Sequence, residues 1–283
     1  MIRHLGWLAG AALVALLAGC SAGTRAVRVD AAALAASAGL RRLDIRTRTF
    51  SLVSYVRFAH APVLRVYIEG DGHAWMSRSE PSDDPTPWNP VALKLAAVDP
   101  APSVAYLARP CQYGVRESDR DCQQLYWTDG RYAELVIASM NAAIDQLLVA
   151  SGARSLELVG FSGGGAVAVL IAARRRDVID IRTAAAVLDI AAWTQRQHLS
   201  PLTGSLNPAD FADRVTEIPQ LHFSGAEDSV VDEGVSRAFA GRFRHLDCVT
   251  FTIVEGVGHG DGWAVRWPML LKNPVRCSGP PSR

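Results

Sequence analysis

The spacing of apolar residues along this 283-residue chain switches repeatedly between a strand pattern and a helix pattern. Short apolar runs predict strands at 64–68, 104–107, 156–159, 183–188, 219–224 and 249–254, and alternation predicts a strand pair at 43–58. Helical periodicity predicts helices at 89–98, 130–150, 163–176, 233–243 and 263–271. This alternation favours an α/β fold, with a mostly parallel central sheet and helices on both faces. Ligands of such sheets bind beyond the carboxyl ends of the strands.

The first residues have a different pattern, typical of a secretory signal. Arg3 and His4 precede an apolar run at 5–18 that is too short to span a bilayer. The run ends in Leu-Ala-Gly-Cys, which resembles the bacterial lipoprotein box. The resemblance implies that residues 1–19 are removed and that Cys20 carries fatty acyl chains such as palmitate. An ordinary signal cut by the usual peptidase is the alternative.

A lipidated Cys20 places the protein in the bacterial cell envelope, bound to a membrane on its periplasmic face. Ser21 is not acidic, and in lipoproteins such a residue favours the outer membrane. Residues 20–42, rich in Ala and Gly, are expected to be a lipidated tether. The folded domain is then expected at 43–277, followed by a frayed tail at 278–283.

Cysteine usage agrees with export. The chain has five cysteines, and without Cys20 an even set remains: Cys111, Cys122, Cys248 and Cys277. In an oxidising compartment these favour two disulfides, and three pairings are open. We expect Cys111–Cys122 and Cys248–Cys277, because each pair closes a local segment. No Cys-x-x-Cys or His-x-x-x-His spacing suggests a metal site.

Charge excludes one class of partner. There are 29 basic and 28 acidic residues, for a net charge of +1, and no basic stripe that would indicate nucleic acid binding. No Gly-x-Gly-x-x-Gly follows a predicted strand and no Gly-Lys-Ser/Thr loop is present, so no nucleotide cofactor is implied.

The strongest chemical signal is Gly160-Phe-Ser162-Gly-Gly164, which lies between the predicted strand at 156–159 and the helix that follows. A Gly-x-Ser-x-Gly turn in that setting holds the serine hydroxyl clear of the sheet, and a side chain at either flanking glycine would collide with a neighbouring strand or helix. Ser162 also precedes the free N–H groups of a helix start, which stabilise negative charge. The alternative is a tight turn whose serine only caps the helix.

Two further strand ends carry the partners that a serine nucleophile needs. The strand at 219–224 runs into Gly225-Ala-Glu-Asp228-Ser-Val-Val, and the strand at 249–254 runs into Gly-Val-Gly-His259-Gly. Serine, acid and histidine in this order match the α/β-hydrolase fold family, which the chain resembles over residues 44–271. The resemblance implies Ser162 as nucleophile, His259 as base and Asp228 as the acid that orients the histidine. Asp189, also at a strand end, is the alternative acid.

The same resemblance implies an oxyanion hole made by the N–H of Gly163 and an N–H from the loop after the strand at 64–68. Family members usually carry His-Gly in that loop. This chain has Glu69-Gly-Asp-Gly-His73, and by position Asp71 is the expected donor.

The function expected from these residues is a serine hydrolase that cleaves an ester or related acyl bond, acting on a small-molecule or lipid-like acyl substrate without cofactor or metal. Acyl transfer and peptide hydrolysis use the same triad and remain open. A non-catalytic envelope lipoprotein that retains the fold is the alternative from another class. The loops at 74–87, 112–127 and 191–211 are expected to build the pocket, and tryptophans in or near them are candidates to line it.

Overall fold

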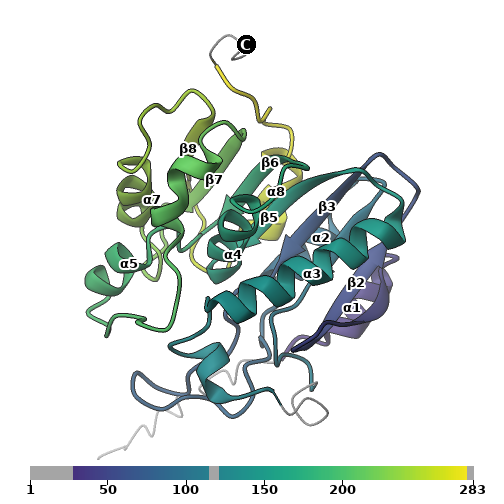
Figure 1. Cartoon of the computed structure of the whole chain (residues 1–283), viewed down its shortest axis with the longest axis horizontal. Coiled ribbons are helices and arrows are strands. Elements are labelled where there is room, and N and C mark those ends of the chain that lie inside the picture. The colour runs from purple at the N-terminus through teal and green to yellow at the C-terminus, as the bar shows by residue number, and fades with distance from the viewer. Residues whose placement is uncertain (1–27, 115–120, 279–283) are drawn as a thin grey trace, which may run out of the picture.

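The computed structural model describes residues 28–114 and 121–278, which form one eight-stranded sheet between two layers of helices (Figure 1). The strands are β1 (Arg41–Arg46), β2 (Ser51–Arg57), β3 (Val63–Ile68), β4 (Val104–Leu107), β5 (Ser155–Phe161), β6 (Val178–Ala184), β7 (Gln220–Gly225) and β8 (Val249–Val254). Their order is β1-β2-β4-β3-β5-β6-β7-β8. The pairs β1–β2 and β2–β4 are antiparallel, and all the other pairs are parallel. The predicted mostly parallel α/β sheet is confirmed.

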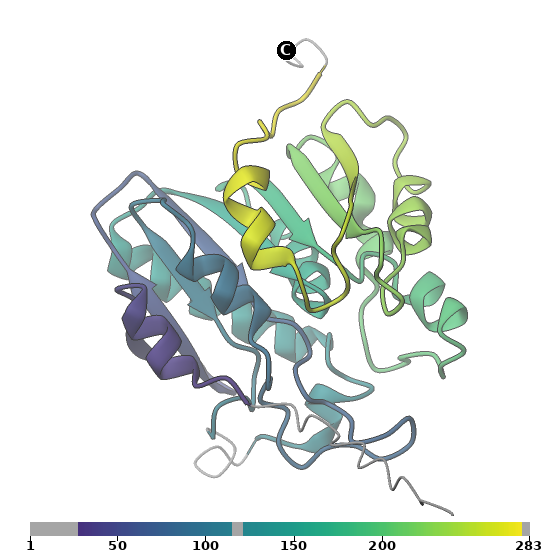
Figure 2. The same cartoon turned by 180° about the vertical axis from the view of Figure 1, so that it is seen from behind.

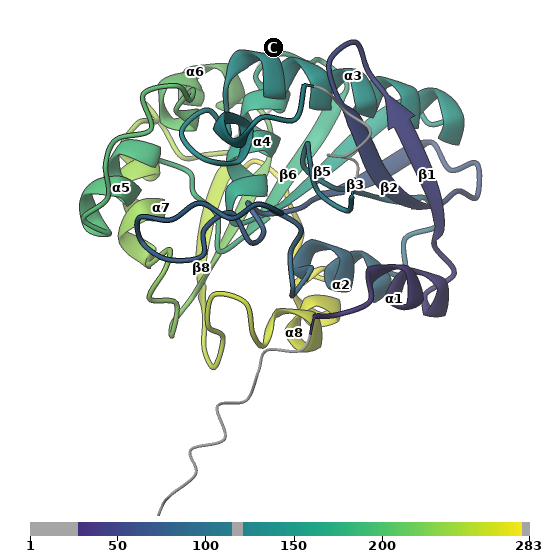
Figure 3. The same ribbon diagram turned by 90° about the horizontal axis from the view of Figure 1, so that it is seen from below.

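Helices cover both faces of the sheet, as Figures 2 and 3 show from behind and from below. One face carries α3 (Glu134–Ser151), α4 (Gly163–Ala172), α5 (Ile190–Arg196), α6 (Ala212–Val215) and α7 (Glu233–Ala240). The other face carries α1 (Ala31–Ser37), α2 (Val91–Ala97) and α8 (Trp263–Leu270). Two 3₁₀ turns, η2 (Gln124–Trp127) and η3 (Pro208–Phe211), lie in the connections. Each face therefore has its own apolar core.

The centre of the sheet is its most buried part. β5 pairs with β3 on one side and with β6 on the other, and every residue of α4 is buried. That burial explains why α4 contains only Gly, Ala, Val, Leu and Ile. The turn between β5 and α4, which contains Ser162, is thus joined to a strand with partners on both sides and to a fully buried helix.

α3 is long and apolar enough to cross a membrane by length and composition. It nevertheless packs on the sheet, where Val136, Ile137, Ile144 and Leu147 are fully buried. It is accordingly a core helix of the domain.

The strand predicted at 183–188 is wrong in its bounds, because β6 runs from Val178 to Ala184. The strand ends where Ala185 adopts a positive φ of 52°. Val187 and Leu188 are apolar because they are buried behind the serine turn, where the N–H of Val187 donates to the carbonyl of Ser162. The true strand contains the charged residues Asp180 and Arg182, which interrupt the apolar pattern although both are buried.

The expected boundary between tether and domain, at 42, is also too late. Asp30 caps α1 by accepting from the N–H groups of Ala32 and Ala33, and Ala31 and Ala35 pack into the core beside α2. The folded part therefore includes α1. The signal peptide, Cys20 and residues 279–283 lie outside the described residues.

The two expected disulfides, Cys111–Cys122 and Cys248–Cys277, are both present. The first closes the segment between β4 and η2. The second joins the start of β8 to the segment after α8, and the N–H of Ser278 donates to the carbonyl of Asp247.

Candidate active site

Ser162 occupies a sharp turn between β5 and α4. Its φ is +51°, a conformation that non-glycine residues rarely adopt and that costs energy. The neighbouring glycines make the turn possible. A Cβ on Gly160 would lie 2.4 Å from the Cα of Gly165, and a Cβ on Gly164 would lie 2.2 Å from the carbonyl oxygen of Ile68 in β3. The expected collisions with a helix and a strand are therefore those that the structure shows.

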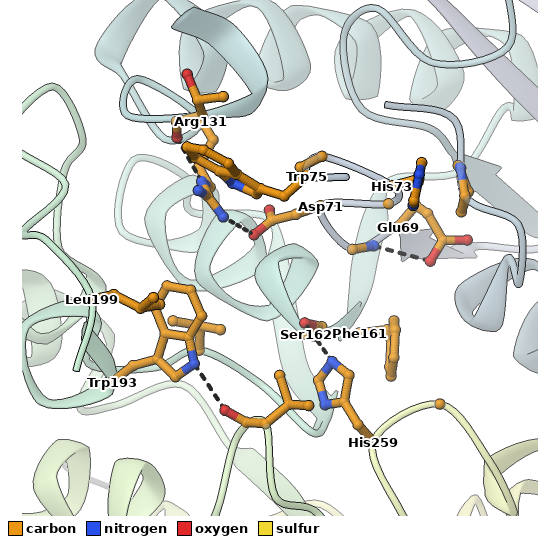
Figure 4. A pocket seen from close by; sticks show the side chains of 18 of the residues that line it. Glu69, Asp71, His73, Trp75, Arg131, Phe161, Ser162, Trp193, Leu199 and His259 are labelled. Atoms are coloured by element: carbon orange, nitrogen blue, oxygen red, sulfur yellow. Dashed lines mark hydrogen bonds and ion pairs between the residues drawn. The ribbon is translucent and has the colours of Figure 1, made fainter. Parts of the chain in front are cut away.

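His259 and Asp228 meet at Ser162. His259 Nδ1 lies 2.9 Å from Asp228 Oδ2, and His259 Nε2 lies 3.1 Å from Ser162 Oγ. Figure 4 shows the His259 ring pointing at Ser162, with Phe161 beside them. If Nδ1–H donates to Asp228, Nε2 is left to accept a hydrogen bond from the serine hydroxyl.

Asp228 is held so that one oxygen faces the histidine. Its side chain is fully buried, and Oδ1 accepts hydrogen bonds of 2.8 Å from the N–H groups of Val230 and Val231. Oδ2 is then directed at His259. The loop after β7 therefore fixes the carboxylate through its own backbone.

The histidine loop is fixed by contacts from two other elements. Trp263, the first residue of α8, donates its indole N–H to the carbonyls of Gly258 and His259. Asn89, just before α2, donates to the carbonyl of Gly260. Both contacts are to backbone atoms, so they hold the loop and leave the imidazole free.

Asp189, the alternative acid, does not reach the histidine. It is the N-cap of α5, where its Oδ1 accepts from Ala192 N–H and from the side chain of Asn207. Its Oδ2 lies 3.2 Å from Arg242 Nη2. The structure thus brings Asp228, and not Asp189, to His259.

Asp71, the expected oxyanion residue, lies in the loop after β3 with its side chain in a buried cluster. Its carboxylate contacts Arg109 Nη1 at 3.1 Å and Arg131 Nη1 at 2.9 Å, and it accepts from the hydroxyl of Tyr132. Burial by itself would raise the pKa of Asp71, but the two guanidinium groups hold that pKa below its ordinary value. Asp71 is therefore an ionised carboxylate with no oxygen left for substrate.

The Asp71 side chain also lies directly on the start of α4. A Cβ on Gly163 would be 2.1 Å from Asp71 Oδ1, so only glycine fits at position 163. The two segments expected to form the oxyanion hole are thus in contact beside Ser162. Arg131 and Tyr132 were predicted only as residues that either line the cleft or pack a loop, and Arg131 does line the cavity. Their contact with Asp71, and the part played by Arg109, were not predicted, since no local pattern connects these residues to a loop some 40 to 60 positions earlier.

Glu69 links the same loop to the start of α2. Its Oε1 accepts from the N–H groups of Gly70, at 3.0 Å, and Ala92, at 3.3 Å. Its Oε2 has no hydrogen-bond partner among the described residues. Burial raises the pKa of Glu69 to about 7, although hydrogen bonds, those from the amides of Gly70 and Ala92 foremost, lower it in part. On the other side of the loop, Gln112 donates to the carbonyl of Gly70.

A cavity of about 800 Å³ opens above Ser162. Its lining comes mainly from the loop after β3, the start of α2 and the segment around α5, and includes Trp75, Trp88, Val91, Phe161, Val187, Trp193, Leu199, Leu202, Val230 and His259. Two of the three expected loops, 74–87 and 191–211, thus contribute, and none of the described residues in 112–127 does. Trp127 and Trp263 are buried outside the cavity lining.

Among the residues that the structure describes, no group of three or more His, Cys, Asp or Glu side chains is placed to hold a metal ion.

Residues 116–256 match the family model described as serine hydrolase (FSH1). The matched region contains Ser162 and Asp228 and ends three residues before His259. No curated protein matches the sequence.

Solved structures with the same fold include an esterase and a putative lipase. Est1E from Butyrivibrio proteoclasticus has a TM-score of 0.55 and 15% identity, covering 82% of this chain and 96% of its own. An esterase from Pyrococcus furiosus has a TM-score of 0.56 and 13% identity, covering 82% and 90%. A putative lipase from Acinetobacter baumannii has a TM-score of 0.56 and 13% identity, covering 88% and 95%. At such identities the likeness concerns the fold.

Proposed function

The chain is a serine hydrolase with the α/β-hydrolase fold, and we propose that it cleaves a carboxylic ester or related acyl bond through an acyl-enzyme on Ser162. The observation that carries the proposal is the hydrogen-bonded series from Asp228 through His259 to Ser162 at the base of the cavity. A serine hydroxyl is a weak nucleophile at neutral pH and needs a base within hydrogen-bonding distance.

In the acylation step, the Ser162 hydroxyl oxygen attacks the substrate carbonyl carbon while its proton passes to His259 Nε2. Asp228 stabilises the imidazolium that forms, because its free oxygen already lies against Nδ1. The tetrahedral intermediate then collapses. The alcohol leaves with the proton from His259, and the acyl group stays on Ser162.

The oxyanion of that intermediate is assigned to the N–H groups of Gly163 and Asp71. Gly163 begins α4, where N–H groups have no partner within the helix and the helix dipole favours negative charge. The contact between Asp71 and Gly163 supports this assignment, since both donors must lie within reach of one oxygen atom.

In the second step, His259 takes a proton from water, and the water oxygen attacks the acyl carbon. The acid is released when the bond to Ser162 Oγ breaks, and His259 returns the proton to that oxygen. An acceptor alcohol in place of water would make the same protein an acyltransferase. Product analysis with added alcohol separates the two reactions: ester formation at the expense of free acid would identify transfer.

The location is proposed from the first residues of the sequence. A lipidated Cys20 would hold the protein in the cell envelope, bound to a membrane on its periplasmic face. The mass of the amino-terminal peptide from the full chain, expressed in a bacterium, tests this. A mature chain that begins at Cys20 without fatty acids would contradict it.

The mechanism is tested with a fluorophosphonate probe and mass spectrometry of the labelled peptide. We expect the label on Ser162 and its loss in the Ser162→Ala and His259→Ala variants. Ser200→Ala is the matched control, because Ser200 lines the same cavity but is not hydrogen-bonded to His259. A folded wild-type chain that takes no label would reject the acyl-enzyme and favour a non-catalytic envelope protein.

A further inference from the structure

Five large apolar side chains surround the opening of the cavity: Trp75, Met76, Trp88, Leu199 and Val230, named here the mouth rim. Four of them line the cavity, and Met76 follows Trp75, with its sulfur 3.1 Å from the Nε2 atom of the cavity residue His73. All five are exposed, from 36% for Leu199 to 59% for Met76. Exposed apolar residues gathered at one place on a surface mark a binding site more often than scattered ones do.

The mouth rim contains the exposed tryptophans of the described chain. Trp75 and Trp88 are 38% and 40% exposed, whereas the other described tryptophans are buried. Trp88 is held in place by the ring of His73, which stacks on it with 4.2 Å between centroids. Tryptophan favours the boundary between water and hydrocarbon because its ring is large and apolar and also carries one N–H group.

The two sides of the mouth rim are joined across the opening. Arg78 donates to the carbonyl of Gln197, which links the loop with Trp75 and Met76 to the segment with Leu199. On the far side, Trp193 donates to the carbonyl of Val230. Figure 4 shows Trp75, Leu199 and Trp193 around the space that leads to Ser162. Apolar side chains therefore line the cavity both at the rim and beside the serine, where Phe161 and Val187 lie.

The described chain begins at this rim. The N–H of Val29 donates to the carbonyl of Trp88 at 2.8 Å, and Arg28 is paired with Asp84. Seven residues lie between Cys20 and Arg28, and the eight steps from one to the other span at most about 28 Å when the chain is fully extended. A lipid on Cys20 would therefore keep the mouth rim, and not the opposite end of the sheet, close to a membrane.

We infer that the mouth rim docks on a lipid surface and that the site takes an amphiphilic acyl ester directly from it. The inference rests on the proposed function of Ser162. An acyl chain that moves from the bilayer along the rim into the cavity stays in apolar surroundings, whereas a chain that crosses water exposes every CH₂ group. The exposed charges beside the rim are Glu80, Asp83, Asp84, Arg28 and Arg78. Three acidic and two basic groups nearly cancel, so the surface is expected to be zwitterionic rather than anionic.

The test uses the full chain in phosphatidylcholine vesicles that contain brominated phosphatidylcholine. Tryptophan quenching by the bromine reports docking. Turnover of a short water-soluble ester and of a long-chain ester dissolved in the vesicles reports catalysis. The informative variant is Met76→Asp, because Met76 is exposed and does not line the cavity. The matched control is Met269→Asp, which is 58% exposed but lies near the far end of α8.

We expect Met76→Asp to reduce quenching and to slow hydrolysis of the vesicle-borne ester about 10- to 100-fold, as loss of one buried methionine side chain implies. Turnover of the soluble ester should stay within about twofold, and Met269→Asp should behave as wild type. Quenching should also persist at high salt, since the rim is apolar.

Two results would overturn the inference: no quenching in the wild-type chain, which would favour a protein partner for the rim, or equal behaviour of Met76→Asp and wild type. Failure of the proposed function has a different signature. A wild-type chain that is quenched by brominated lipid but hydrolyses neither ester would keep the docking surface and reject the hydrolase mechanism.

Discussion

The loops that follow β6 and β7 each contain a buried aspartate, and the two carboxylates are used in different ways. In the β7 loop, backbone N–H groups occupy one oxygen of Asp228 and the other oxygen meets His259. In the β6 loop, a helix start and Asn207 occupy one oxygen of Asp189 and Arg242 contacts the other. Position at a strand end is therefore not sufficient to bring a carboxylate to His259. What matters is whether one oxygen is left for a histidine.

The largest effect that distinguishes these loops is expected from Asp228→Asn, with Asp189→Asn as its control. Loss of the Asp228 charge removes the group that fixes the histidine tautomer, so kcat for a soluble ester should fall about 10³- to 10⁴-fold. Asp189→Asn should change kcat by less than about threefold, because its carboxylate contacts no triad member. A larger loss in Asp189→Asn than in Asp228→Asn would reverse the assignment.

Glu69 extends the comparison to a carboxylate whose second oxygen meets no partner among the described residues. In the fold its pKa is raised to about 7, from 4.5 as the ordinary value. Between those values the folded state holds a proton that the unfolded state has lost, so the free energy of unfolding falls as pH rises. The fall stops near pH 7, and its size is on the order of 3 kcal/mol.

The measurement compares wild type with Glu69→Gln in chemical denaturation at pH 4 and pH 8, with the disulfides intact. Contributions from all other groups are common to both proteins and cancel in the difference. Wild type should lose stability relative to Glu69→Gln as pH rises. A difference that does not change with pH would show that Glu69 is ionised in the fold without penalty.

Asp71 differs from these carboxylates because both of its oxygens have hydrogen-bond partners and its side chain lies against Gly163, next to Ser162. In Asp71→Asn the backbone N–H remains, so any effect reports the side chain and its hold on the loop. We expect kcat to fall about 10- to 100-fold with KM nearly unchanged, because a displaced oxyanion donor weakens only the transition state. Affinity for a trifluoromethyl ketone, which forms a tetrahedral adduct, should fall in parallel.

Asp99→Asn is the matched control for that prediction. Asp99 is also buried and is also bound by an arginine and a tyrosine, Arg65 and Tyr67. It lies after α2, and no atom of it lines the cavity. Asp99→Asn should lower stability and leave kcat unchanged. Equal kcat losses in the two variants would mean that Asp71 acts only through stability.

The smallest effect is expected from Asp189→Ala. Loss of the N-cap of α5 should lower the free energy of unfolding by about 1 kcal/mol without changing kcat. Denaturant titration checks the first part and soluble-ester turnover the second. A marked loss of activity in a fully folded variant would give this loop a role in catalysis after all.

Much of this arrangement could be predicted from the sequence, because local signals carried it. The strand at 249–254 has the predicted bounds, and the elbow around Ser162 depends on glycines whose clashes are local. The helix α5 was missed in a segment expected to be irregular, although Asp189 before it is an ordinary N-cap signal. The apolar residues Val187 and Leu188 were predicted to belong to a strand. They are buried because they pack behind the turn that contains Ser162.

The residues around Asp71 could not be predicted in the same way. Arg109 follows β4 and Arg131 precedes α3, and the fold alone brings them to one carboxylate. Their pattern is not periodic, and each residue by itself is an ordinary surface type. The pairing depends on the order β4-β3-β5, which no local stretch contains.

The Cys248–Cys277 disulfide makes the segment that carries His259 a closed covalent ring. A pull on the carboxyl end of the chain reaches Cys277 first and passes through the disulfide to Cys248, at the start of β8. The tension therefore bypasses the histidine loop and loads the sheet. His259, the proposed base, is thus mechanically separated from the end of the chain, so unfolding from that end cannot withdraw His259 before the sheet itself is disrupted.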